Sequence, residues 1–234
     1  MEDIVSVQPR LSAPLLRVLA LSVPVLFTAC GPKTGTPLEP PSGPFTVSDY
    51  FAASGDMADG DGKSAPGMIT TSQFIGTACG DKTRPTGARG DCFKFDYVPG
   101  PNLFAGVYFQ YPANNWGGMA GLPVHSDKFT KVSFQFAVSA NNQTTLRFAA
   151  GGIGYPMHSQ ADLDMGYTFS DQFISQDLPS NSTTDWQPFT LNVPQGMSIT
   201  NIIGAFAWYA SYPMGADFTT LPPTTVYIDD LVYE

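Results

Sequence analysis

The sequence is poor in charge, and its acidic residues are almost all aspartate. Charged residues make up 13% of the 234 residues, about half of the usual share. Of the 20 acidic residues only Glu2, Glu39 and Glu234 are glutamate, which leaves 17 aspartates. Glutamate favours helices, whereas aspartate is typical of turns, loops and calcium sites. The scarcity of glutamate therefore predicts an all-β protein with Asp-bearing loops.

Positive charge is scarce as well. The chain has 11 Lys and Arg and a formal net charge of -9. Binding to nucleic-acid phosphates needs a basic face, and adsorption to anionic lipid headgroups needs a basic cluster. We therefore expect no nucleic-acid partner and no simple electrostatic binding to a membrane surface.

The residues of common catalytic sites are also few. His125 and His158 are the only histidines and both fall in expected loops, which argues against a catalytic zinc site. No G-x-S-x-G motif occurs. Glycoside hydrolysis needs two carboxylates, and those on offer are the pairs Asp162 and Asp164 or Asp171 and Asp177, which are more typical of loop caps. We expect no enzyme, with a polysaccharide-acting enzyme as the less favoured alternative.

No apolar run near the N-terminus is long enough to span a bilayer. Arg10 and Arg17 precede a short run, residues 18–27, and then "TAC", which is typical of a secretory signal. The segment "LFTAC" resembles a bacterial lipobox, and this resemblance implies a signal peptide over residues 1–29 and lipidation of Cys30. Gly31 in place of Asp then favours the outer membrane or cell surface. The alternatives are a plain signal peptide or a buried N-terminal helix.

Residues 30–44 form the next segment, rich in Pro and Gly, and we expect a semi-rigid tether. Only three cysteines occur. If Cys30 carries lipid, Cys79 and Cys92 are left to form a disulfide. Closing the loop between them would stabilise the folded protein by about 3 kcal/mol. The alternative is two reduced thiols, which an oxidising compartment disfavours.

Alternation of apolar and polar residues recurs from residue 45 onward. Phe93, Phe95 and Tyr97 share one face of "CFKFDYV", and similar runs occur in "GVYFQY", "FTKVSFQFAVS", "TTLRFAA", "QPFTLNV", "IIGAFAWYA" and "TTVYIDDLVY". Turn residues separate the runs, and residues 154–185 form a weaker excursion. This pattern predicts a β-sandwich or barrel.

Several of these segments carry a resemblance to a known family. "VSDYFAASGDMADGDG", "AGVYFQYPANNWGG", "KVSFQFAVS", "TTLRFAAGG" and the final "VYIDDLVYE" resemble the jelly-roll β-sandwich domains of carbohydrate-binding modules. The resemblance covers residues 45–234 and implies two antiparallel sheets of the galactose-binding or carbohydrate-binding-module type. The chain departs from the family at "FQFAVSA", where members commonly carry Trp.

An acidic loop accompanies this resemblance. Asp56, Asp59 and Asp61 lie among glycines, although without EF-hand spacing. Jelly-roll domains of this kind use a structural calcium between an N-terminal loop and the last strand, which implies Asp229 or Asp230 as further ligands. The alternative is a solvated acidic turn whose carboxylates cap backbone amides.

Aromatic and amide residues supply the expected ligand contacts. In a sugar-binding site, aromatic rings form the apolar wall, and amides or Arg form the polar anchors. The predicted contact residues are Tyr108, Gln110, Asn114, Asn115, Trp116, Arg147, Trp208 and Tyr209. The alternative is that these rings fill the core. Trp186 is expected to cap the core edge. The sequence thus predicts a monomeric, lipid-anchored protein that binds a carbohydrate polymer without chemistry. The alternative function is a structural or adhesive envelope protein that binds another protein.

Overall fold

The structure is a computed structural model that describes residues 39, 41–61, 67–125, 129–139, 144–151, 153, 174–178, 184–195 and 201–234. The chain divides into two units, Met1–Pro37 and Leu38–Glu234, and all described residues belong to the second. The expected signal peptide, Cys30 and most of the tether lie outside the described residues, so these stay predictions. His158 and the pair Asp162 and Asp164 lie outside them too.

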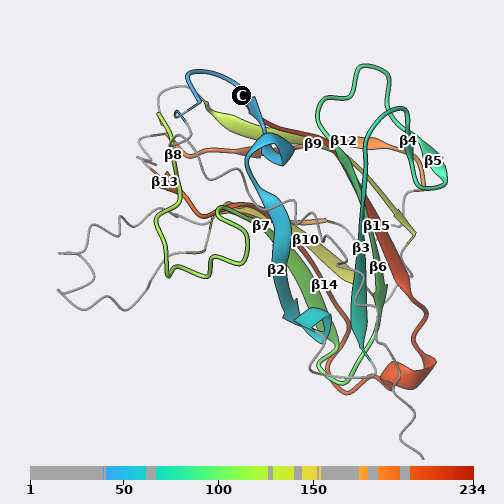
Figure 1. Ribbon diagram of the computed structural model, residues 1–234. Coiled ribbons are helices and arrows are strands. Elements are labelled where there is room, and N and C mark those ends of the chain that lie inside the picture. The colour runs from blue at the N-terminus through green and yellow to red at the C-terminus, as the bar shows by residue number, and fades with distance from the viewer. Residues whose placement is uncertain are drawn as a thin grey trace, which may run out of the picture. The chain divides into compact units, whose positions relative to one another are not determined.

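Two antiparallel sheets make up the second unit (Figure 1). The β15 sheet has the order β12 (Gln187–Asn192), β9 (Lys131–Ser139), β15 (Thr224–Tyr233), β6 (Cys92–Val98), β3 (Met68–Phe74), and β1 (Phe45–Thr46) also pairs with β15. The β14 sheet has the order β11 (Ile174–Leu178), β10 (Thr145–Ala150), β14 (Gly204–Ser211), β7 (Phe104–Gln110), β2 (Ala52–Ala58).

Short elements join the ends of these strands. Two small ladders pair β4 (Ala78–Cys79) with β5 (Lys82–Thr83) and β8 (Leu122–Pro123) with β13 (Asn201–Ile202). The described 3₁₀ turns are η1 (Val47–Asp49), η2 (Asp59–Asp61) and η4 (Phe218–Thr220). In this part of the chain no helix is long and apolar enough to cross a membrane.

The core is aromatic and lies between the sheets. Phe93 of β6 meets Phe109 of β7 at 4.7 Å between ring centroids, and Phe134 of β9 meets Phe206 of β14 at 4.8 Å. Both pairs are edge-to-face, the arrangement that the ring quadrupoles favour. Alternation directs these side chains inward, so the predicted all-β sandwich of two antiparallel sheets is confirmed.

The outer faces of the two sheets differ. The β15 sheet turns outward polar side chains such as Ser72 and Lys94, and it also carries an apolar cluster in which Ala137 and Tyr227 pack with Cys79 and Cys92. The outer side of the β14 sheet carries an apolar cluster of Tyr108, Ala149, Ile153, Ile203 and Ala207, against which Met57 and Tyr209 pack. A two-sheet sandwich needs apolar side chains only on its inner faces, so each outer cluster calls for a further reason.

Candidate functional site

Four rings lie in a row on the outer side of the β14 sheet, and we call them the aromatic ridge: Phe104, Tyr108, Trp116 and Tyr209. Trp116 meets Tyr108 edge-on at 5.8 Å, and Phe104 lies 5.9 Å from Tyr209. Tyr108 pairs with Ala207, and Gly106 with Tyr209, so the two tyrosines are diagonal neighbours across the strands. Phe104 and Tyr108 are four positions apart on β7, which is about 13 Å of strand.

The rings of the ridge differ in exposure. Trp116 is 51% exposed, whereas Tyr108 is only 7% exposed because Ile153 and Ile203 pack in the same cluster. Phe104 and Tyr209 are half-buried. The ridge therefore offers one open indole, with the other rings as its supporting surface. Sequence reasoning missed Phe104, although its alternation with Ala105 could have placed it beside Tyr108.

Arg147 of β10 lies at the side of the ridge. Its guanidinium carbon is 6.0 Å from the centre of the Tyr209 ring, within the range of a cation–π contact. The strand register places Arg147 opposite Tyr209. The structure thus brings together four of the predicted contact residues, Tyr108, Trp116, Arg147 and Tyr209.

Trp208 does not belong to this set, and the prediction that it contacts a ligand is wrong. It is fully buried and packs in the core at 5.1 Å from Phe95. Successive residues of a strand point to opposite faces, so Trp208 and Tyr209 of β14 are on different sides of the sheet. Among the described residues, the Nε1 of Trp208 is the buried side-chain atom without a hydrogen-bond partner.

Gln110 and Asn115 are also not contact residues. Their exposed fractions are 0% and 1%, and both amides bond to the loop that carries Trp116. Asn114 is exposed and has a φ of 62°, in the left-handed region that Asn tolerates. Two of the three predicted amide anchors therefore hold the loop that carries Trp116 and are closed to a ligand.

The predicted calcium ligands do not meet at one site. Asp59 is fully buried and accepts hydrogen bonds from Tyr97 Oη (2.8 Å), Gly100 N (2.9 Å) and Asn102 N (3.0 Å). A Cβ at Gly67 or Gly100 would come within 2.8 Å of its carboxyl carbon. Burial and the bond to Asp59 raise the pKa of Tyr97, so the phenol stays a donor. A cation binds to carboxylate oxygens that are free of other partners. The oxygens of Asp59 already accept hydrogen bonds from three donors.

Asp229 and Asp230 bind arginines instead. Asp229 is fully buried and accepts Nε and Nη2 of Arg84 at 2.8 and 2.6 Å, and Asp230 accepts Nε of Arg89 at 2.7 Å. Neighbouring residues of a regular strand would point apart, but a bulge between Asp229 and Val232 interrupts β15, and bulges redirect side chains. Both carboxylates therefore face the same loop.

The two acidic groups are also far apart along β15. Tyr97, which binds Asp59, pairs with Thr224, and Asp229 follows five residues later, about 16 Å along the strand. Among the described residues no group of three or more His, Cys, Asp or Glu side chains is placed to hold a metal. Asp56 lies near Asp61, at an exposed position of β2. The predicted shared calcium site is wrong in its ligands, and these residues do not fit one ion.

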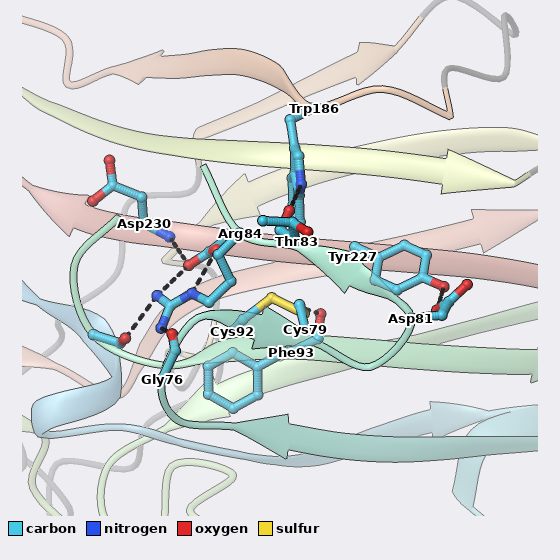
Figure 2. Close-up of a disulfide and its surroundings, with 12 residues drawn as sticks. Gly76, Cys79, Asp81, Thr83, Arg84, Cys92, Phe93, Trp186, Tyr227 and Asp230 are labelled. Atoms are coloured by element: carbon cyan, nitrogen blue, oxygen red, sulfur yellow. Dashed lines mark hydrogen bonds and ion pairs between the residues drawn. A yellow bond between two sulfur atoms is a disulfide. The ribbon is translucent and has the colours of Figure 1, made fainter. Parts of the chain in front are cut away.

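The predicted disulfide between Cys79 and Cys92 is confirmed (Figure 2). It closes a loop that lies against the outer side of the β15 sheet, where Tyr227 Oη donates to Asp81 at 2.6 Å. Trp186 Nε1 donates to Thr83 O at 2.8 Å. Trp186 thus holds this loop and, from the start of edge strand β12, packs on the outer cluster that includes Tyr227 rather than on the core between the sheets.

No protein-family model matches the chain, and no curated protein sequence matches it. Among solved structures it is similar to the family 11 carbohydrate-binding module of the cellulosomal cellulase Lic26A-Cel5E of Clostridium thermocellum, with 12% identity over 82% of this chain and 94% of that one, at a TM-score of 0.41. The family 30 module of the cellulosomal cellulase Cel9D-Cel44B of the same organism shares 13% identity over 74% and 94% of the two chains, at a TM-score of 0.36. These values mark a distant resemblance and carry no assignment of ligand.

Proposed function

We propose that the protein binds a carbohydrate polymer without chemistry, through the aromatic ridge. The observation that carries this proposal is the half-exposed indole of Trp116, held against Tyr108 on an outer face that carries an apolar cluster. The C–H faces of sugar rings stack on such rings, and their hydroxyls need polar partners nearby. Arg147 and the Tyr209 hydroxyl supply these partners at the edge of the ridge.

The charge of the protein narrows the ligand class. The formal net charge is -9, and a protein with this charge repels polyanions at low ionic strength. The expected ligand is therefore an uncharged polysaccharide. Its chain would follow β7, because the ridge is extended along this strand rather than closed around one sugar.

The location of the protein belongs to the same proposal. A lipid on Cys30 would anchor the chain, and residues 31–44 would hold the sandwich away from the bilayer. Gly31 favours an anchor in the outer membrane or at the cell surface, where the sandwich would encounter a polymer. Replacement of Cys30 by Ala is expected to release the protein from the membrane fraction, and unchanged co-fractionation with lipid would contradict the anchor.

A protein partner is the second candidate, and one observation favours it. Met119 is 47% exposed in the same loop as Trp116, and Met and Trp are enriched at protein interfaces. Such a partner would pack flat on both side chains, whereas a sugar needs the indole alone. Met119→Ala should therefore weaken a protein interface and leave polysaccharide retention unchanged.

The test of the proposal is retention of the full chain, in mild detergent, on insoluble neutral polysaccharides and on a glycan array. The test variant is Trp116→Ala, and the matched control is Trp186→Ala, a half-buried tryptophan on the other sheet. Loss of the stacking ring is expected to weaken retention at least tenfold in the first variant only. No retention of any glycan by the unaltered protein would overturn the proposal and direct attention to protein partners.

A further inference from the structure

We propose that a polar cluster of half-buried Ser54 and buried Gln110 and Asn115 positions the indole of Trp116, so that the ridge has its binding geometry before a ligand arrives. This inference rests on the proposed function for its purpose. The hydrogen bonds that carry it do not depend on the ligand, because all of them are made within the protein.

Asn115 is the centre of the cluster. Its Nδ2 donates to Tyr111 O (3.0 Å) and Met119 O (2.8 Å), and its Oδ1 accepts from Gly117 N and Met119 N (both 3.0 Å). Two donors and two accepted bonds are the full capacity of a side-chain amide. One buried side chain thus ties both ends of the turn that carries Trp116.

Gln110 and Ser54 link this turn to the sheet. Gln110 Nε2 donates to Asn115 O at 3.0 Å, and Ser54 Oγ donates to Gln110 Oε1 at 3.1 Å. Ser54 Oγ also accepts from Asn114 N at 2.9 Å. The three side chains therefore form a continuous chain of bonds from β2, through the last residue of β7, to the turn.

A bulge in β2 makes this link possible. The register passes from Ala53 opposite Phe109 to Gly55 opposite Tyr108, which leaves Ser54 as the extra residue. Bulges redirect a side chain that regular pairing would point elsewhere. Gly55 completes the arrangement, because a Cβ there would lie 2.7 Å from the Gln110 amide carbon.

The polar cluster fixes the position of Trp116, which the packing contacts of its indole cannot do alone. The indole is 51% exposed, so little of its orientation is set by packing. Burying amides costs free energy unless their bonds are made, and a satisfied network specifies one geometry. A ring that is already fixed loses less conformational freedom when a ligand binds.

The experiment uses the full chain labelled with 5-fluorotryptophan and ¹⁹F NMR. The three tryptophans give three resonances, and Trp116→Phe identifies the one from Trp116. Asn115→Asp puts an oxygen against two carbonyl groups, and Ser54→Ala removes one hydroxyl. In both variants the Trp116 resonance is expected to shift towards that of the free amino acid, and the shift should be larger in Asn115→Asp. The resonances of Trp186 and Trp208 should stay in place.

Ser48→Ala is the matched control, because its hydroxyl likewise accepts a backbone N–H, from Asp91 at 3.0 Å, away from the ridge. It should leave all three resonances unchanged. A static Trp116 resonance in Ser54→Ala and in folded Asn115→Asp would overturn the inference, and so would an equal shift of all three, which would indicate a general structural role. If Trp116 alone shifts but no form binds any glycan, the positioning role stands and the proposed function fails.

Discussion

The two outer faces of the sandwich use their side chains in opposite ways. On the β15 sheet the side chains that the disulfide loop covers are bonded to it, as Asp229 is to Arg84 and Tyr227 to Asp81. On the β14 sheet the buried amides of Gln110 and Asn115 bond to the loop that carries Trp116, and the indole is left to solvent. One face is closed by the chain itself and the other presents a surface. We infer that the first serves stability and the second recognition.

The largest effect expected from this comparison is on the closed face. Arg84→Met would leave the fully buried Asp229 without its cation, and breaking a buried pair in this way costs about 3–5 kcal/mol. Urea denaturation followed by circular dichroism would measure the loss in the free energy of unfolding.

Arg89→Met is the matched control for that variant. Arg89 and Asp230 are 47% and 22% exposed, and exposed pairs contribute about 0–1 kcal/mol. Equal losses in the two variants would show that burial of Asp229 does not matter, and the distinction between the faces would weaken.

A smaller effect is expected at Tyr227 and depends on pH. The hydrogen bond from the Tyr227 phenol holds the pKa of Asp81 below its ordinary value of 3.8. A depressed pKa in the folded state stabilises the protein above the unfolded value, and this contribution is lost as pH falls through the folded value. In Tyr227→Phe the pKa of Asp81 should rise towards 3.8, as an NMR titration of the carboxyl would show. If the pKa of Asp81 is the same in Tyr227→Phe as in the unaltered protein, the backbone and lysine contacts of Asp81 are enough to lower it without the phenol.

Alternation was a good guide to which face each strand residue occupies. It placed Phe93, Phe95 and Tyr97 on one face of their strand, and the structure buries all three in the core. It could not show how the bulges in β2 and β15 turn Ser54 and Asp230, because a bulge depends on the partner strand. The bond between Arg84 and Asp229 joins residues 145 positions apart, a separation at which no local pattern operates.

The acidic motifs show the same limit. The resemblance to jelly-roll domains implied one cation shared by Asp59 and the final pair of aspartates, and like charges gathered in this way would repel without it. In the fold, each carboxylate has donors from a different segment, such as Tyr97 for Asp59 and Arg89 for Asp230. Composition identified the charges that needed partners, but only the tertiary structure identifies the partners.

The smallest expected effect tests this last point. Because Tyr97, Gly100 and Asn102 already bond to Asp59, chelation with EDTA should leave the melting temperature unchanged. Asp59→Asn should instead lower the stability by about 1–3 kcal/mol, since the new NH₂ group would face donors in a buried site. The loss should be the same with and without chelator. A fall of several degrees on chelation of the unaltered protein, reversed by added calcium, would show that a bound ion stabilises the fold and that the donors around Asp59 do not satisfy it.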